Sequence, residues 1–208
     1  MHNQNAELDA LRAQLLRCRR CRHPGAISPI VSLARSPKVM LVGQAPGKTE
    51  ARGGKPFAGR AGKTLFAWLQ RAGIDEAMAR ERIYISAVTR CYPGPSPGGR
   101  GDRVPTPEER RNCSGWLESE LRIIRPALII PVGRLAIDAL VGPLPLHEVV
   151  GREFRSAVGR SPAVVPLPHP SGASSWIHAP GHADLLGGAL SLIGRHWSAL
   201  HRSGRRVA

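Results

Sequence analysis

Hydrophobic and polar positions follow two recurring patterns along the chain. Short, predominantly apolar runs, typical of buried parallel strands, occur at 39–42, 83–88, 127–132 and 163–167. Between them, apolar residues recur three and four positions apart, which predicts helices over 6–17, 64–72, 106–124, 133–140 and 184–200. Strands that alternate with helices at this spacing indicate an α/β fold. We expect a three-layer α/β/α arrangement around a central, mostly parallel four-stranded sheet, with residues 1–208 forming a single domain.

Two stretches of the chain break these patterns. Residues 43–62 and 93–103 are rich in Gly and Pro and are predicted to be loops. In open parallel sheets, ligands bind beyond the carboxyl ends of the strands. We therefore expect the functional site in the loops that follow Val42, Val88 and Leu167.

The net charge of the chain indicates what kind of molecule it binds. The chain carries 30 Lys and Arg against 15 Asp and Glu, a formal net charge of +15, and nearly all of the cations are Arg. Such an excess attracts polyanions, and the guanidinium fork suits phosphate oxygens, so nucleic acid is favoured. The alternative is Arg usage spread evenly over the surface. No apolar run of about 18 residues predicts a membrane span, and the N-terminus does not resemble a secretory signal. We expect a cytoplasmic monomer.

The four cysteines are spaced like metal ligands. Cys18 and Cys21 form a CxxC pair, and Cys91 and Cys113 follow much later. In an intracellular chain this pattern is typical of a zinc site or an iron–sulfur cluster, and spacing alone does not separate the two. Four ordinary buried thiols are the remaining alternative.

One apparent phosphate-binding loop fails on its spacing. The motif needs four residues between its first Gly and the Gly-Lys pair. Gly43 and Gly47 enclose three, and the later Gly-Lys-Thr at 62–64 has Phe57 where a Gly is required. A nucleotide hydrolase is therefore disfavoured, and with it the hypothesis of a zinc-bearing nucleotide enzyme.

Five segments, in order, resemble the motifs of iron–sulfur uracil-DNA glycosylases. Gly-Gln-Ala-Pro-Gly at 43–47, followed by Gly-Lys-Pro-Phe-Ala-Gly-Arg-Ala-Gly at 54–62, is similar to the first motif of that family. The other matching segments are the cysteine pair at 18–21, the strand at 84–91, the helix start at 105–113 and His-Pro-Ser at 169–171. The resemblance lies between the family 4 and family 5 patterns. It implies a monofunctional DNA repair enzyme that flips out uracil and hydrolyses its N-glycosidic bond, leaving an abasic site.

The resemblance also implies roles for individual residues. A [4Fe-4S] cluster would bind the four cysteines, in a region formed by 18–21 and 91–113. His169 would donate to uracil O2, where the leaving-group charge gathers, and Phe57 would stack on the flipped base. Ser171 would hold a phosphate of single- or double-stranded DNA. The pocket would be lined by Gly43, Ala45, Pro46, Gly47 and Ala87.

Three positions depart from the family pattern. Gln44 stands where many relatives carry a Glu that positions water, and an amide cannot accept the proton of that water. Ala87 replaces a frequent Asn, and Arg60 replaces the Asp of the broad-specificity branch. Gln44 and Asp102 are the candidates for handling water, although Asp102 lies in a Gly/Pro loop where a solvated role is the simpler interpretation. These departures keep open a second hypothesis, a catalytically weak or silent DNA-binding relative.

Overall fold

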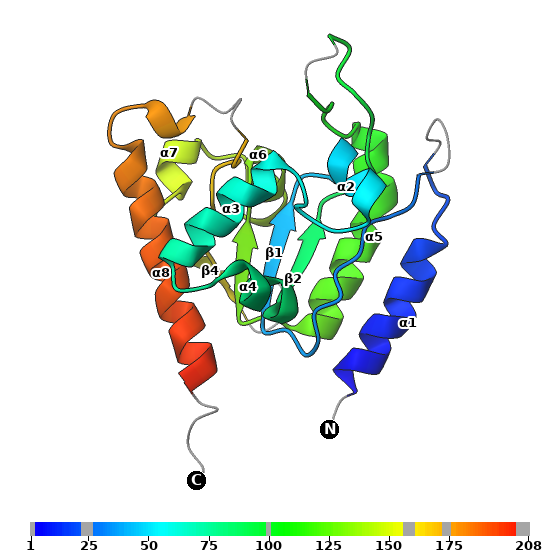
Figure 1. Ribbon diagram of the computed structural model, residues 1–208, viewed down its shortest axis with the longest axis horizontal. Coiled ribbons are helices and arrows are strands. Elements are labelled where there is room, and N and C mark those ends of the chain that lie inside the picture. The colour runs from blue at the N-terminus through cyan, green and yellow to red at the C-terminus, as the bar shows by residue number, and fades with distance from the viewer. Residues whose placement is uncertain (1–2, 22–26, 99–100, 156–160, 172–175, 203–208) are drawn as a thin grey trace.

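A computed structural model describes the protein over residues 3–21, 27–98, 101–155, 161–171 and 176–202. A sheet lies at the centre, with helices on both of its faces (Figure 1). Its strands are β1 (Val39–Gly43), β2 (Ile83–Ala87), β3 (Leu128–Pro131), β4 (Phe154–Arg155) and β5 (Ala163–Val164).

The sheet is mostly parallel, as predicted. Its strand order is β2-β1-β3-β5-β4, and only the pairing of β4 with β5 is antiparallel. The predicted number of four strands is wrong because β4 adds a fifth at the edge. This strand has two residues, neither of them buried, so no apolar run announces it. Beyond β5, the chain keeps its parallel course through a bridge between Leu167 and Val132.

All five predicted helices are present, and shorter ones accompany them. The helices are α1 (Gln4–Leu16), α2 (Lys48–Gly53), α3 (Arg60–Arg71), α4 (Glu76–Arg82), α5 (Pro107–Ile124), α6 (Arg134–Leu140), α7 (Leu146–Val149), α8 (His182–Arg202) and the 3-10 turn η1 (Trp176–His178). The interpretation of 43–62 as loop throughout is wrong, because α2 and the first turn of α3 lie within it. The six residues of α2 are mostly polar and exposed, so no hydrophobic periodicity marks them. No helix in the described part of the chain is long and apolar enough to cross a membrane.

The central strand β1 explains the three layers. Successive side chains of a strand point to opposite faces. Val39 and Leu41 pack with residues of α3 and α8 on one face, whereas Met40 and Val42 pack with residues of α5 and α6 on the other. All four are fully buried, so both faces of this strand are covered.

The carboxyl ends of the strands bring the candidate loops to one edge of the sheet. Gly43 at the end of β1 is paired with Ala87 at the end of β2. On the other side, the backbone N–H of Gly133, just after β3, donates to the carbonyl of Leu167 at 2.9 Å. The loop that begins at His169 therefore starts beside the end of β3.

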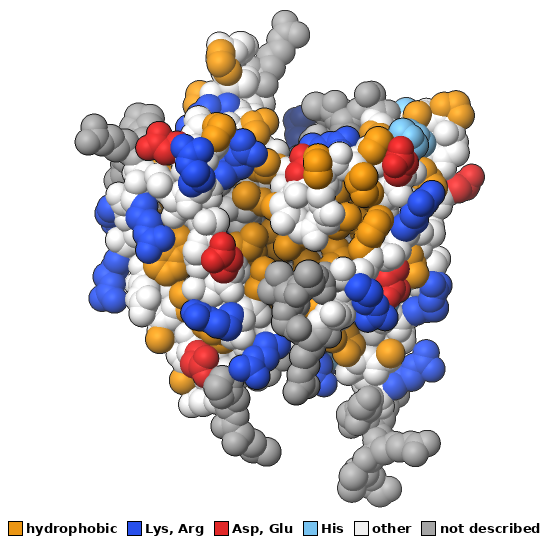
Figure 2. All heavy atoms as spheres, turned by 180° about the vertical axis from the view of Figure 1, so that it is seen from behind, with side chains coloured by type: hydrophobic (Ala, Val, Ile, Leu, Met, Phe, Trp, Pro, Cys, Tyr) orange, Lys and Arg blue, Asp and Glu red, His pale blue; other side chains and the backbone are white. Residues whose placement is uncertain are grey.

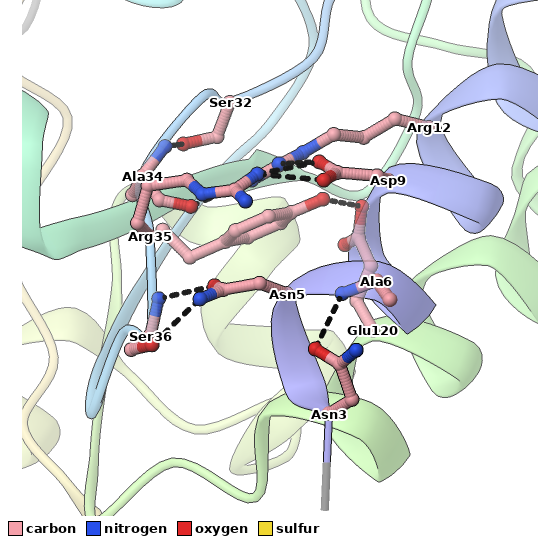
Figure 3. Close-up of polar contacts among 11 residues, drawn as sticks. Asn3, Asn5, Ala6, Asp9, Arg12, Ser32, Ala34, Arg35, Ser36 and Glu120 are labelled. Atoms are coloured by element: carbon pink, nitrogen blue, oxygen red, sulfur yellow. Dashed lines mark hydrogen bonds and ion pairs between the residues drawn. The ribbon is translucent and has the colours of Figure 1, made fainter.

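Helix α1 is fixed to the segment that leads into β1 (Figure 3). The Asn5 side chain exchanges hydrogen bonds with Ser36, at 2.8 and 3.0 Å. Asp9 accepts from both Arg12 and Arg35 at 2.7 Å, and the hydrogen bond from Arg35 lowers the pKa of Asp9. These contacts hold the first half of α1, the helix that leads to the cysteine pair, against residues 35 and 36.

Candidate functional site

The Phe57 ring lies against the end of β1. A Cβ atom built on Gly43 would lie 3.0 Å from Phe57 Cζ, so a larger residue there would push the ring back by a few tenths of an ångström. Phe57 is itself in the left-handed region, with φ 49°. A non-glycine residue in that conformation costs about 1–3 kcal/mol and persists only where its neighbours hold it. The half-buried ring thus forms an aromatic wall at the sheet edge, on a strained turn.

His169 follows Leu167, which lies beside the end of β3. A hydrogen bond to its ring defines one tautomer. Its Nδ1 accepts a hydrogen bond from the backbone N–H of Ser171 at 3.2 Å. The neutral ring therefore carries its proton on Nε2, which becomes a donor. Burial lowers the pKa of His169, which keeps the ring neutral at pH 7. A Cβ on Gly133 would lie 3.0 Å from His169 Cδ2, so the end of β3 supports the ring directly.

Glu50 fastens the two halves of the first motif together. Its carboxylate accepts from the backbone N–H of Gly47 and from that of Gly59, each at 3.0 Å. The side chain is buried, and both of its oxygens are engaged. The sequence marks Glu50 only as an acid in a loop. Its bridging role depends on the turn that returns the chain from Gly47 to Gly59, which residue spacing does not reveal.

Asp102 reaches the same motif from a different loop. A Cβ on Gly47 would meet Asp102 Oδ2 at 2.8 Å and Glu50 Oε2 at 2.7 Å, so the two carboxylates lie close together over Gly47. The loop folds back through a bridge between Pro95 and Asp102. Burial and a hydrogen bond with Asp102 both raise the pKa of Tyr92. Asp102, an exposed residue, therefore lies beside Gly47 of the first motif.

The remaining predicted pocket residues gather at the same edge. The carbonyl of Gln44 accepts from the backbone N–H of Thr89 at 3.1 Å, which joins the first motif to the end of β2. Ala87 is half-buried there and offers only a methyl group. Ser171 presents its backbone N–H to His169. Ala45 and Gly47 are half-buried, and Pro46 is buried.

The four cysteines line one cavity of about 340 Å³. Two of them accept hydrogen bonds from nitrogen: the Arg90 backbone N–H lies 3.3 Å from Cys113 Sγ, and Asn112 Nδ2 lies 3.7 Å from Cys21 Sγ. Burial, and then the neighbouring Cys113, raise the pKa of Cys91 to about 12. Thiols that disfavour ionisation in this way ligate metal only if a bound cation offsets their charge.

The positions of the sulfur atoms can be compared with those of known thiolate sites. Among the residues that the structure describes, no three Cys, His, Asp or Glu side chains lie close enough together to hold one metal ion. In a zinc site, four sulfurs converge on one ion at about 2.3 Å. Here the sulfurs surround a cavity and receive N–H donors, a feature that tunes iron–sulfur clusters. Four thiols around one cavity are a donor set that fits a thiolate-bound metal site or an iron–sulfur cluster.

A buried ionic network lies between the cysteine cavity and the end of β2. Glu120 of α5 accepts from Tyr84 Oη at 3.0 Å, from Ser86 Oγ at 2.9 Å and from the Arg90 guanidinium. Burial raises the pKa of Glu120, and the Arg90 cation opposes that rise. Sequence analysis missed this residue. The available signal was a carboxylate at helical spacing among apolar residues, beside Trp116 and Leu117.

The positive charge is dispersed over the face shown in Figure 2. Lys and Arg side chains lie around its periphery, and hydrophobic side chains gather nearer its centre. This distribution does not form a single basic patch on that face.

Comparison with known proteins gives a consistent result. The family description "Uracil DNA glycosylase superfamily" matches residues 31–183. The chain is 34% identical over 136 residues to a type-4 uracil-DNA glycosylase of Thermotoga maritima. The aligned region covers 64% of this chain and 65% of that relative. It is 30% identical to the type-4 enzyme of Archaeoglobus fulgidus over 79% of this chain and 81% of the relative. A type-5 uracil-DNA glycosylase of Thermus thermophilus is 31% identical, over 53% and 52% of the two chains.

Proposed function

We propose, from the premise that this chain belongs to the uracil-DNA glycosylase superfamily, that it removes uracil from DNA as a repair enzyme. The reaction is hydrolysis of the N-glycosidic bond and leaves an abasic site. The observation that carries the proposal is the neutral, half-buried His169, whose ring is oriented by Ser171 so that Nε2 carries the proton.

The leaving group determines what His169 has to do. When the bond to the sugar breaks, negative charge develops on the uracil ring, partly at O2. A preorganised N–H donor aimed at that oxygen stabilises the charge, and removing one such donor typically costs about 100- to 1,000-fold in rate. Because the Nδ1 atom is occupied by the Ser171 N–H, Nε2–H is the donor that His169 presents.

Phe57 is the proposed platform for the flipped base. A base taken out of the helix needs an aromatic or apolar surface to replace the stacking it has lost. Phe57 lies over Gly43 of β1, and His169 packs on Gly133 after the adjacent strand β3. Neighbouring strands are about 4.8 Å apart, so the two rings stand at neighbouring strand ends. Residues 43–47, with Ala87, complete the proposed pocket.

We assign the attacking water to Asp102 and Gln44. The Glu50 carboxylate is engaged by two backbone N–H groups, whereas Asp102 holds an exposed carboxylate close to it over Gly47. A carboxylate is a proton acceptor, and the Gln44 amide can only orient water. In this assignment, Gln44 orients the attacking water and Asp102 accepts its proton.

The four cysteines are the proposed ligands of a [4Fe-4S] cluster. When bound, this group ties the end of α1 to the segment after β2 and to α5, and it supplies structural cross-linking. The shared cavity and the N–H donors to sulfur support a cluster over zinc. Metal-bound thiolates need a reducing compartment, which supports our expectation of a cytoplasmic protein.

DNA is the proposed partner, single- or double-stranded. The net charge of +15 supports attraction to phosphates, and Ser171, in the loop that begins at His169, is the proposed phosphate contact. We further propose that the chain acts as a monomer and that residues 1–208 form one domain.

The test is a gel assay for alkali-labile sites in uracil-containing DNA. Wild-type protein should produce them, and His169→Ala should be slower by about 100- to 1,000-fold under single-turnover conditions. His178→Ala removes an exposed histidine from η1 and serves as the matched control, with near-normal rates expected. DNA binding by His169→Ala should change much less, because phosphate contacts dominate affinity. A wild-type protein that binds DNA without producing abasic sites would instead support the catalytically silent relative.

A further inference from the structure

We propose that Arg80 is a positioning residue for catalysis, which fixes the turn that carries Phe57 from the neighbouring helix α4. This inference rests on the proposed function, because it assumes that Phe57 stacks on the flipped base. Arg80 lies outside every motif that resembles the glycosylase family. It contributes through the Phe57 turn and not by touching substrate.

The Arg80 guanidinium holds two successive carbonyl groups of the turn. One of its terminal nitrogens donates to the Pro56 carbonyl at 2.9 Å, and the other donates to the Phe57 carbonyl at 3.2 Å. Hydrogen bonds with a charged donor are stronger than neutral ones, and the planar fork fixes direction as well as distance. Both peptide groups that flank the Phe57 Cα on its N-terminal and C-terminal sides are therefore restrained by one side chain.

The turn needs such a restraint. Phe57 adopts a positive φ of 49°, which a residue with a side chain rarely adopts without support. Its carbonyl also lies close to α3, since a Cβ built on Gly62 would come within 1.9 Å of that oxygen. Gly62 permits this close packing but donates nothing to hold it. Arg80 supplies the polar partner for the same carbonyl.

Arg80 is itself held in place from two sides. Its guanidinium lies over the Phe66 ring of α3, 4.5 Å from the centroid, which adds a cation–π contact. Its Nε donates to Glu76 one helical turn earlier at 2.8 Å. With the guanidinium fixed in this way, the two carbonyl contacts form without much further loss of side-chain entropy. The clamp is thus preorganised before DNA arrives.

Preorganisation of this turn matters for the rate of base excision. A platform that moves lets the flipped base leave the geometry in which His169 meets its oxygen, and misplacement of about 1 Å can cost about 100-fold. We therefore expect Arg80→Ala to slow single-turnover excision by about tenfold or more. Arg82→Ala is the matched control. Arg82 is on the same helix and half exposed, and its ion pair with Glu81 is long, at 4.0 Å. It should cleave within about twofold of wild type.

A double-mutant cycle tests whether Arg80 acts through Phe57. Rates are measured for Arg80→Ala, Phe57→Ala and the double variant, well below their melting temperatures. The double variant should be within about twofold of Phe57→Ala. If the slowing by Arg80→Ala persists in full on the Phe57→Ala background, or if Arg80→Ala matches Arg82→Ala, the proposal is overturned. Arg80→Lys keeps the charge without the fork and should be intermediate; wild-type rates would contradict a two-carbonyl clamp.

Amide hydrogen exchange provides a readout that does not depend on glycosylase activity. In Arg80→Ala, the segment 54–62 should exchange faster, including the Gly59 N–H that donates to Glu50. In Arg82→Ala it should not. Unchanged exchange in Arg80→Ala refutes the clamp even if the wild type excises uracil. Faster exchange with no uracil excision by the wild type would leave the clamp standing and refute the proposed function.

Discussion

Replacing Gly133 by alanine changes the support of His169 without touching the histidine. Gly133 has φ 84° and ψ 163°, a region that is essentially restricted to glycine. An added Cβ would lie 3.0 Å from His169 Cδ2 and 3.3 Å from His169 Cβ. Since ordinary carbon–carbon contacts are about 3.5–4.0 Å, the ring has to retreat by about half an ångström.

The structure gives the expected loss of stability and the expected loss of excision rate. The backbone conformation alone should lower the free energy of unfolding by about 1–3 kcal/mol. Complete loss of the His169 donor corresponds to about 100- to 1,000-fold in rate, so displacing it should cost less than that limit. We expect Gly133→Ala to lose about tenfold or more in single-turnover excision, which corresponds to about 1.4 kcal/mol of transition-state stabilisation.

Thermal unfolding and single-turnover cleavage, measured on the same samples, separate the two effects. Gly73→Ala is the control because Gly73 has a similar φ of 81° but no heavy atom within 4 Å of an added Cβ. That variant should lose stability and keep its rate. If Gly133→Ala loses stability but cleaves as fast as Gly73→Ala, the end of β3 does not determine where His169 points, and our account of the donor is wrong.

Three further predictions concern the cofactor, the pH dependence and the charge. Protein purified without oxygen should be brown and contain iron and sulfide, and Cys113→Ser should reduce its soluble yield; stoichiometric zinc without iron would contradict the cluster. Since burial lowers the pKa of His169 and the neutral ring is the donor, the excision rate should stay constant from pH 8 to about 6.5 and fall only at lower pH. A fall that begins above pH 7 would contradict this. Binding to duplex DNA should weaken with salt, with a log–log slope near −4 to −5 for about five phosphate contacts, and a slope near zero would contradict the electrostatic argument.

The larger elements of the fold could be predicted because their patterns are long and strongly apolar. The runs at 39–42, 83–88 and 127–132 became β1, β2 and β3, and the helical periodicity at 106–124 became α5. The missed elements lack such a pattern. Helix α2 consists of six mostly polar residues, and β4 of two residues that no apolar run marks. Such short elements are set by tertiary contacts, which local sequence does not encode.

The edge of the sheet at which the candidate residues lie could be predicted, but the arrangement of their side chains could not. The strand ends placed Gly43, Ala87 and His169 at one edge because parallel strands share their direction. Some contacts that support the site come from residues far away in sequence, such as Arg80 on the Phe57 turn and Glu120 on Arg90. Nothing in residue spacing distinguishes an exposed Arg or Glu from one that holds a loop. The tautomer of His169 and the engagement of Glu50 depend on nearby backbone N–H groups, but the turns that aim those groups were not marked by the sequence, so both emerged only from the structure.

The four strand ends that meet at this edge also bear on how the protein regains activity after unfolding. The edge needs β1, β2, β3 and β5 together. Val39 of β1 pairs with Leu128 of β3, which is much farther along the chain than any other parallel partner in the sheet. Pairing between such distant segments forms slowly. A refolding chain would therefore show much of its helical structure before β1 and β3 have paired and the strand ends have met. Recovery of excision should lag behind recovery of circular dichroism and mark completion of the parallel sheet.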